Sequence, residues 1–446
     1  MSKSCLKLGS AAVVLLSALA SLAPATPALA QQDPAPLVAG STTKGGLVDG
    51  TQILHVTSLA DNGPGSLREA VETPGPRVIV FDVGGAIHLA SDLKLHEPFL
   101  TIAGQTAPSP GVSLWGASLR VRTHDVVLQH IAVRAGPGPT AKINDNRDAI
   151  SIDGSNTAPE AQQSYQVRLE NVSASWSVDE AVSLWYATTH NVTIRHSIVS
   201  EALNNAGHPK GRHSMGLLVG TNVQTVTITG DLLVSNMFRN PVMGKGTSAF
   251  VANNYIVNPG QNAIHFYNRG SDAPSLATVV NNVVEAGPDT KPTINGVLVP
   301  MGMKEEDTAD KVFIDGNLMD LGPRGQEVKT GPGLVLATEP PVTGGDWALK
   351  PVDAVKEDVL RHAGARPADR DPTDRRLIRQ IHDGSARIID SGPETADFEN
   401  VTRRTANVPK DPLALASDGR TRLENWLCRQ HFAVGGAPSE DCPARR

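Results

Sequence analysis

The segment Val167-Arg168-Leu169-Glu170-Asn171 is a short run of alternating apolar residues that closes on asparagine. Similar segments recur along the chain, and each ends in a polar residue or glycine that is followed by a second short apolar run. They occupy residues 126–130, 192–196, 226–230, 250–254, 278–282 and 313–317, and their last residues lie 24 to 41 positions apart. This spacing is typical of coils made of three short strands and inserted loops, where each coil buries its apolar face only by stacking on the next. The repeat therefore predicts an all-β fold, a right-handed, single-stranded parallel β-helix.

The composition favours strands and tight turns over helices. Aromatic residues make up only 4% of the chain, and the repeats are rich in valine, isoleucine, threonine, asparagine and glycine. Asparagine suits a strand end because it tolerates the left-handed backbone conformation and bonds neighbouring backbone groups. The competing fold is a β-sandwich, but regularly spaced Asn-Gly hairpin signals are sparse.

Residues 1–30 have the pattern of a secretory signal peptide. Lys3 and Lys7 precede an apolar run over residues 11–20, and residues 28–30 place small side chains at the cleavage position. We therefore expect the mature protein to be secreted or periplasmic. No later run is long and apolar enough to span a bilayer, so no membrane association is expected.

The chain is acidic, with a formal charge of −6 that becomes −8 without Lys3 and Lys7. This charge makes nucleic acid an improbable partner. An anionic polysaccharide would need a local basic groove or a bridging cation.

The last hundred residues depart from the repeat. Residues 353–362 and 373–382 have the spacing of short amphipathic helices. We therefore divide the mature chain into a β-helix domain over residues 31–335 and a helical or irregular C-terminal extension over residues 336–446. The extension is expected to pack on the side of the coils or to cap their C-terminal end.

Two cysteines remain once the signal peptide, which contains Cys5, is removed. Cys428 and Cys442 lie close together in an exported chain, which predicts one disulfide in the C-terminal extension. The alternative is two free thiols.

Six motifs occur in a fixed order along the first three quarters of the chain. They are residues 65–71 (GSLREAV), 77–85 (RVIVFDVGG), 100–108 (LTIAGQTAP), 148–152 (DAISI), 175–180 (SWSVDE) and 239–241 (RNP). This ordered set resembles the pectate lyases of polysaccharide lyase family 1. The resemblance implies a right-handed parallel β-helix that requires Ca²⁺ and cleaves polygalacturonate, an anionic plant cell-wall polysaccharide, by β-elimination. We expect the enzyme to be a monomer.

Arg239 is the candidate catalytic base because it matches the arginine of the family's Arg-x-Pro element. Elimination from a uronic acid requires removal of the C5 proton and stabilisation of the charge that develops on the C6 carboxylate. A bound cation stabilises that charge without transferring a proton. Arginine is normally protonated, so the base form needs a cation-rich groove or high pH. The alternative is an arginine that merely pairs with a carboxylate on the surface of the coils.

Three acidic residues are candidate calcium ligands. Asp148 and Asp179 match ligand positions of the family, and Glu180 is adjacent, although a solvated turn residue is an equal interpretation for Glu180. Carboxylates suit calcium because it takes many oxygen ligands flexibly. Asn146 and Ser183 stand where the family has further acids, so we expect weak calcium binding until the substrate adds its own carboxylates.

Four cations are candidate substrate-binding residues. Lys210, Arg212 and His213 lie on one loop, where Met215 occupies the position of the family's substrate-binding lysine. Lys245 is the cation nearest to a second arginine position of the family. A basic loop is equally compatible with simple solvation.

Two residue pairs carry weaker predictions. His208 and His213 suggest a metal-binding pair, but no third histidine or cysteine completes a site. Trp176 and Trp185 are candidates for stacking on sugar rings, although packing beneath a loop is the simpler interpretation.

Two other functions fit the same fold. A hydrolase of the polygalacturonase type needs two carboxyl groups at a fixed separation, but Asp179 and Glu180 are sequence neighbours whose side chains diverge on a strand. A non-catalytic carbohydrate-binding β-helix is the second alternative, suggested by Asn146, Ser183 and Met215.

Overall fold

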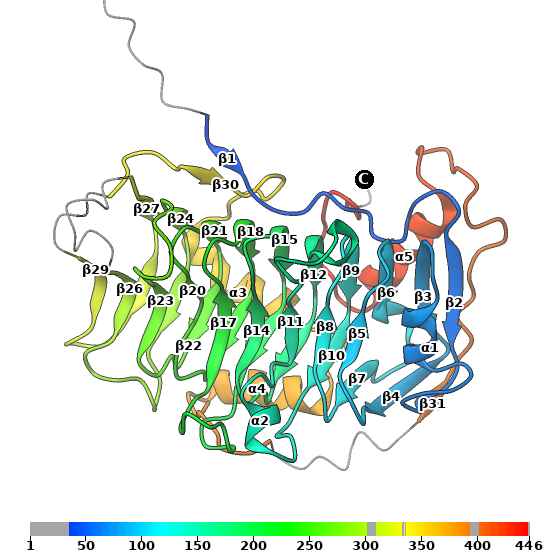
Figure 1. Cartoon of the computed structure of the whole chain (residues 1–446), viewed down its shortest axis with the longest axis horizontal. Coiled ribbons are helices and arrows are strands. Elements are labelled where there is room, and N and C mark those ends of the chain that lie inside the picture. The colour runs from blue at the N-terminus through cyan, green and yellow to red at the C-terminus, as the bar shows by residue number, and fades with distance from the viewer. Residues whose placement is uncertain (1–34, 301–308, 332–333, 335, 393–400, 445–446) are drawn as a thin grey trace, which may run out of the picture. The chain divides into compact units, whose positions relative to one another are not determined.

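Each short strand pairs with the equivalent strands of the coils before and after it. This pairing builds three sheets that run along the stack of coils (Figure 1). The coil strands pair in parallel, as in Val167↔Val192 and Val192↔Val226. The prediction of a parallel β-helix is confirmed in this computed structural model, which describes residues 35–300, 309–331, 334, 336–392 and 401–444. The predicted signal peptide lies outside the described residues.

The first sheet is the one that carries the candidate site. The first sheet contains β5 (Leu93–Leu95), β8 (Leu119–Val121), β11 (Ile150–Ile152), β14 (Glu180–Leu184), β17 (Met215–Val219), β20 (Val242–Met243), β23 (Asn262–Phe266), β26 (Asn295–Val299) and β29 (Gln326–Thr330). The second sheet contains β2 (Gln52–Val56), β3 (Arg77–Phe81), β6 (Leu100–Ala103), β9 (Val126–Gln129), β12 (Tyr165–Glu170), β15 (His190–Arg195), β18 (Gln224–Thr229), β21 (Ser248–Ala252), β24 (Leu276–Val280) and β27 (Lys311–Asp315). The third sheet contains β4 (Val83–His88), β7 (Val112–Trp115), β10 (Ile131–Arg134), β13 (Ser173–Ser175), β16 (Ile198–Ser200), β19 (Leu232–Val234), β22 (Tyr255–Val257), β25 (Val283–Glu285), β28 (Leu318–Asp320) and the antiparallel β31 (Thr402–Arg403).

Most coils turn from the second sheet to the third over two residues, and the two have different tasks. The first has a positive φ, as at Asn171 (51°) and Asn281 (50°). The second forms a ladder along the stack, in which the backbone N of Asn254 donates to Oδ1 of Asn282 at 3.1 Å and that of Asn282 donates to Oδ1 of Asn317 at 2.9 Å. Both roles expected for asparagine, the left-handed turn and the bond to neighbouring backbone, are confirmed.

Alternate residues of the strands point into the coils and form one continuous apolar core. Val182 and Leu184 of β14 are fully buried in it, beside Ile150 and Ile152 of β11. Side chains between them, such as Ser183, therefore point to the outer face of the first sheet.

The N-terminal segment crosses the second sheet from later coils to earlier ones. It follows β1 (Leu37–Val38), which pairs with β30 (Val342–Thr343). Residues 39–46, called the strap here, bond to five successive coils. The partners are Thr225 O, Thr193 Oγ1, Gln166 Oε1, Asp125 Oδ1 and Thr101 Oγ1.

Two of the C-terminal helices cover the third sheet. They are α3 (Val352–His362) and α4 (Pro372–His382), each of which begins one residue before the predicted helix. Val355 and Leu377 pack against Leu232 and Tyr255. The helices thus lie on the side of the coils, which decides between the two expected placements.

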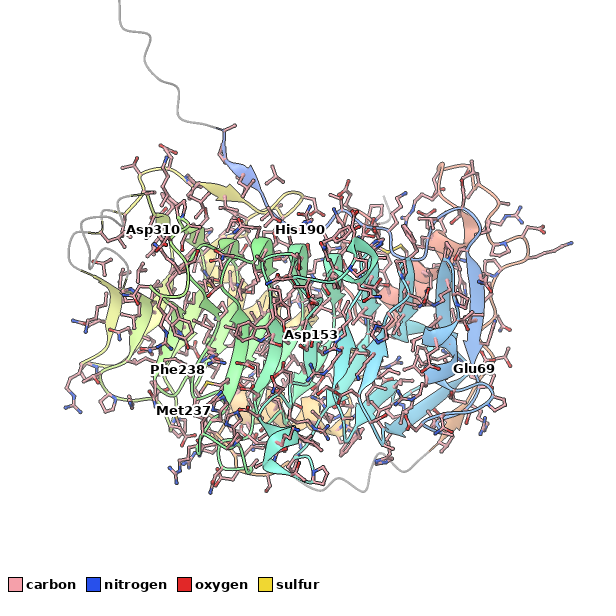
Figure 2. The ribbon with its side chains drawn as sticks, viewed as in Figure 1. Glu69, Asp153, His190, Met237, Phe238 and Asp310 are labelled. Atoms are coloured by element: carbon pink, nitrogen blue, oxygen red, sulfur yellow. A yellow bond between two sulfur atoms is a disulfide. The ribbon has the colours of Figure 1, made fainter. Side chains whose placement is uncertain are left out.

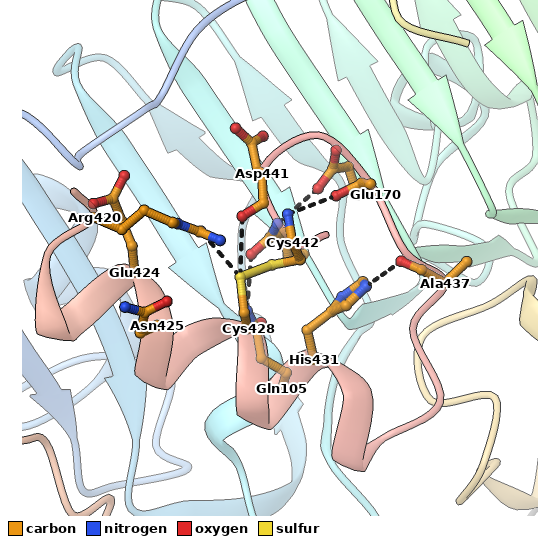
Figure 3. Close-up of a disulfide and its surroundings, with 12 residues drawn as sticks. Gln105, Glu170, Arg420, Glu424, Asn425, Cys428, His431, Ala437, Asp441 and Cys442 are labelled. Carbon is orange, nitrogen blue, oxygen red and sulfur yellow. Dashed lines mark hydrogen bonds between the residues drawn. A yellow bond between two sulfur atoms is a disulfide. The ribbon is translucent and has the colours of Figure 1, made fainter. Parts of the chain in front are cut away.

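A third C-terminal helix packs on the second sheet near the first coils. Leu423 and Leu427 of α5 (Arg422–Ala433) contact Val78 and Val80. The predicted disulfide is confirmed, because Cys428 of α5 is bonded to Cys442 with the two Cα atoms 5.3 Å apart (Figure 3).

The remaining helices are short. They are α1 (Leu67–Glu72), η1 (Gly104–Thr106), α2 (Ala141–Asn144) and η2 (Glu160–Gln162). Among the described residues, no helix combines the length and apolarity that crossing a membrane requires.

Candidate active site

Three carboxylates meet at the outer face of the first sheet. Asp148 lies just before β11, Asp179 just before β14, and Glu180 opens β14, whose Val182 pairs with Ile150. Because parallel strands in register bring their preceding loops together, residues 32 positions apart become neighbours. One oxygen of each carboxylate lies within 4.8 Å of the others. The structure therefore brings the three predicted calcium ligands together. The side chains of Asp179 and Glu180 converge here, so the expectation that these sequence neighbours diverge is wrong.

Asp148, a member of this carboxylate cluster, is buried, with 3% of its surface exposed. It accepts hydrogen bonds from the backbone N of Glu180 at 3.0 Å and from the hydroxyl of Ser183. Burial, together with the neighbouring Asp179 carboxylate, raises the pKa of Asp148 to about 7. A cation bound beside Asp148 would favour the anionic form of this carboxyl group against the effect of burial.

Arg239 lies against the carboxylate cluster. It belongs to the loop between β19 and β20, and its guanidinium forms an ion pair with Glu180. Its φ of 63° is unusual for a residue other than glycine, and such strain concentrates at functional sites. The side chain of Asn240 anchors this turn through bonds to the carbonyls of Asn236 and Asn262, both at 3.3 Å. The loop therefore holds the candidate base beside the candidate metal ligands.

Asn146 and Ser183, the two positions that depart from the family pattern, form structural hydrogen bonds. Ser183 donates its hydroxyl to Asp148. The carbonyl of Asn146 accepts from Nη2 of Arg120 at 2.6 Å. Neither residue supplies a carboxylate to the cluster.

Arg120 is a site neighbour that the sequence reasoning missed. It points outward from β8, where Arg120 pairs with Ser151 of β11, which in turn pairs with Ser183 of β14. Asp92 and Asp153 hold the guanidinium at 2.9 Å and 2.6 Å. Aligning the repeats by coil would have placed Arg120 in this outward row.

The loop before β17 brings one predicted cation to the cluster and leaves two exposed. Nε2 of His213 lies 2.7 Å from Oδ1 of Asp179. The ammonium of Lys210 lies 3.5 Å from Asp145 and remains 70% exposed, and Arg212 is exposed as well. His208 stacks on His213, and the carboxylate of Asp179 lies close enough to both rings to complete a group of three potential metal ligands, a third member that the sequence did not reveal.

Lys245 does not join the cluster, contrary to our expectation. It is 4% exposed, and its Nζ lies 2.5 Å from Oδ2 of Asp310. Figure 2 shows Asp310 well apart from Asp153, the residue that holds Arg120 at the site. Burial with this partner argues against a substrate-binding role.

The two tryptophans differ in exposure. Trp176 is 3% exposed, donates to Glu201 at 3.1 Å and packs edge-on against Trp115, as the packing interpretation predicts. Trp185 follows β14 and is 41% exposed.

Known proteins resemble the chain over most of its length. It is 30% identical over 407 residues to a protein of Aspergillus oryzae named "Probable pectate lyase C", which covers 83% of this chain and 87% of the relative. A protein of Aspergillus flavus with the same name is 29% identical over 411 residues, covering 84% of this chain and 88% of the relative. No protein-family model matches the chain.

The fold is shared with a solved structure. The major allergen from cedar pollen, Jun a 1, superposes with a TM-score of 0.51 at 16% identity, over 72% of this chain and 91% of that chain. From its relatives, its ordered motifs and its fold, the chain belongs to the pectate lyases of polysaccharide lyase family 1.

Proposed function

We propose that this protein cleaves polygalacturonate by calcium-assisted β-elimination on the outer face of the first sheet, with Arg239 as the base. The observation that carries the proposal is the position of Arg239 against Glu180, within a cluster of three carboxylates. β-Elimination needs a proton acceptor close to a group that stabilises the charge on the substrate carboxylate. This face of the sheet provides candidates for both.

The carboxylate cluster suits a calcium ion. Asp148, Asp179 and Glu180 offer hard oxygen donors from two adjacent strands. Burial, followed by the nearby Asp179 carboxylate, raises the pKa of Asp148, and a bound cation would favour the anionic form that acts as a ligand. Calcium, when bound there, would stabilise the charge that develops on the substrate carboxylate.

Arg239 would take the C5 proton of the uronic acid. The electron pair of that C–H bond then forms the double bond between C4 and C5, and the bond from C4 to its glycosidic oxygen breaks. Arginine accepts a proton only in its neutral form, which high pH favours. Arg239 must also separate from Glu180 to reach the substrate.

The exposed cations would hold the polymer. Lys210 and Arg212 project from the loop beside Asp179, so they meet an anionic chain that lies over the carboxylate cluster. We assign no such role to Lys245.

The remaining proposals concern the protein as a whole. We infer that it is secreted or periplasmic, acts as a monomer and consists of a β-helix domain over 31–335 with a C-terminal extension over 336–446. The packing of α3 and α4 on the third sheet supports an extension that braces the coils.

Incubating the mature protein with polygalacturonate, with and without a chelator, tests the proposal. We expect an unsaturated, ultraviolet-absorbing product that forms only with calcium and that Arg239→Ala abolishes. Reducing ends without the unsaturated product would indicate hydrolysis, and binding without any product would indicate a non-catalytic protein.

A further inference from the structure

A second group of potential metal ligands lies beside the carboxylate cluster and includes Asp179. His208 and His213 stack with ring centroids 3.7 Å apart and planes 7° from parallel. Oδ1 of Asp179 lies 3.7 Å from Nε2 of His208 and 2.7 Å from Nε2 of His213. Oδ1 of Asp145, directly after α2, lies 3.6 Å from Nε2 of His208. Two nitrogens and two oxygens from three segments of the chain thus converge.

The least satisfied atom of this group is Nε2 of His208. The His208 side chain is fully buried, and within the described part of the chain its Nε2 has no hydrogen-bond partner. Among the described residues, Oδ1 of Asp145 is likewise buried without a hydrogen bond, although the ammonium of Lys210 lies 3.5 Å away and Nε2 of His208 lies 3.6 Å away. Folded proteins leave few buried polar atoms unpaired, and a missing ion is one explanation.

The separations around His208 fit an ion better than hydrogen bonds, whereas Nε2 of His213 is hydrogen-bonded to Oδ1 of Asp179 at 2.7 Å. A tetrahedral site with bonds of about 2.0 to 2.1 Å places its ligand atoms about 3.3 to 3.4 Å apart. Nε2 of His208 lies 3.6 Å and 3.7 Å from its two carboxylate oxygens, too far for hydrogen bonds and close to this value.

We propose that His208, His213 and Asp179 bind a transition-metal ion such as zinc, with Asp145 as the fourth ligand. Imidazole nitrogen selects such ions, whereas calcium takes oxygen ligands. This site is distinct from the carboxylate cluster and linked to it through the shared Asp179, so an ion here would fix both Asp179 and the loop that carries Lys210 and Arg212.

Binding requires two local rearrangements. Nε2 of His213 must release the proton that it shares with Oδ1 of Asp179 at 2.7 Å, and these two atoms must move apart. The second change is at His208. The backbone N of Lys210 donates to Nδ1 of His208 at 3.1 Å, so the neutral ring carries its proton on Nε2. For Nε2 to bind a metal, that proton must move to Nδ1, and the Lys210 amide must turn away. Lys210, Gly211 and Arg212 are exposed, and Gly211 has a φ of 87°, so this turn has room to change.

Titration of the full mature chain, without a histidine tag, with Co²⁺ and then Zn²⁺ tests the proposal. We expect one equivalent of Co²⁺ with the visible absorbance of a tetrahedral nitrogen and oxygen site, displaced by Zn²⁺. Because even outer-sphere partners affect metal affinity by about 10- to 100-fold, His208→Gln and His213→Gln should each weaken binding at least about tenfold. His96→Gln, at an exposed histidine outside the group, and Asp148→Asn, in the carboxylate cluster only, should leave it unchanged.

Hydrogen exchange of the unsubstituted protein supplies a readout that does not depend on a variant folding. Zn²⁺ should speed exchange of the Lys210 amide, because that amide loses its acceptor. No saturable binding, equal loss in His96→Gln, or loss in Asp148→Asn alone would overturn the assignment. Unchanged exchange at Lys210 with Zn²⁺ bound would overturn the role of His208.

Discussion

Asp231→Asn is expected to stabilise the protein, and by more as the pH rises. Asp231 occupies the ladder position that Asn254 and Asn282 occupy in later coils. Its Oδ1 accepts from the backbone N of Ser197 at 2.6 Å, but its buried Oδ2 has no partner among the described residues. In the next coil the corresponding atom, Nδ2 of Asn254, donates to the carbonyl of Ile228 at 2.9 Å. Asparagine at 231 would place a donor where the structure now has an unpaired acceptor.

The pH dependence follows from the environment of Asp231. Burial raises the pKa of this carboxyl well above its ordinary value. The folded state therefore holds a proton that the unfolded state releases, so the stability contributed by Asp231 is full below about pH 4 and declines as the pH rises towards the folded-state pKa. The decline is at most about 1.4 kcal/mol per pH unit.

Urea unfolding at pH 5, 6 and 7 measures this decline. The advantage of Asp231→Asn in the free energy of unfolding should grow from pH 5 to pH 7, by at most about 1.4 kcal/mol per pH unit. The matched control is Asn282→Asp, which places the same acid further along the ladder and should introduce a similar decline. Parallel pH profiles for Asp231→Asn and the unsubstituted protein would refute the reasoning.

Four further results are expected. Arg239→Lys should retain polymer binding but lose about 10²- to 10⁴-fold in kcat, the usual contribution of a positioned base, because an ammonium cannot reproduce the guanidinium geometry; near-full kcat would make Arg239 a binding residue. A chelator should abolish lyase activity and added calcium should restore it, whereas full activity in excess chelator would exclude the calcium requirement. Lys245→Ala should leave KM unchanged but cost about 3 to 5 kcal/mol in the free energy of unfolding, because it strands the buried Asp310; a raised KM with unchanged stability would contradict this. The unreduced, denatured protein should not react with a thiol-alkylating reagent, since Cys428 and Cys442 are bonded; two reactive thiols would contradict the bridge.

The sequence alone predicted the coils because each coil repeats the same local pattern. A few neighbouring residues are enough to predict a strand that ends at a residue with left-handed backbone conformation, such as Asn171. The convergence of Asp148 with Asp179 was predictable only through the family motifs, since 31 residues separate them and the loop lengths vary. Burial of Lys245 was not predictable, because its partner Asp310 lies 65 residues further along the chain. The partnership of His213 with Asp179 depends in the same way on which residues two loops bring together.

The strap has a consequence for how the coils come apart. A solenoid whose coils contact only their neighbours can fray from its C-terminal end, one coil at a time. Here the chain beyond β1 runs back across five coils, from Thr225 to Thr101, while β1 itself is paired with β30, some 300 residues later. Opening of any of these five coils must therefore strip the strap from it, which couples their separate openings into one cooperative event. The same connection delays completion of the fold, because during synthesis residues 37–38 have no partner strand until residues 342–343 have emerged.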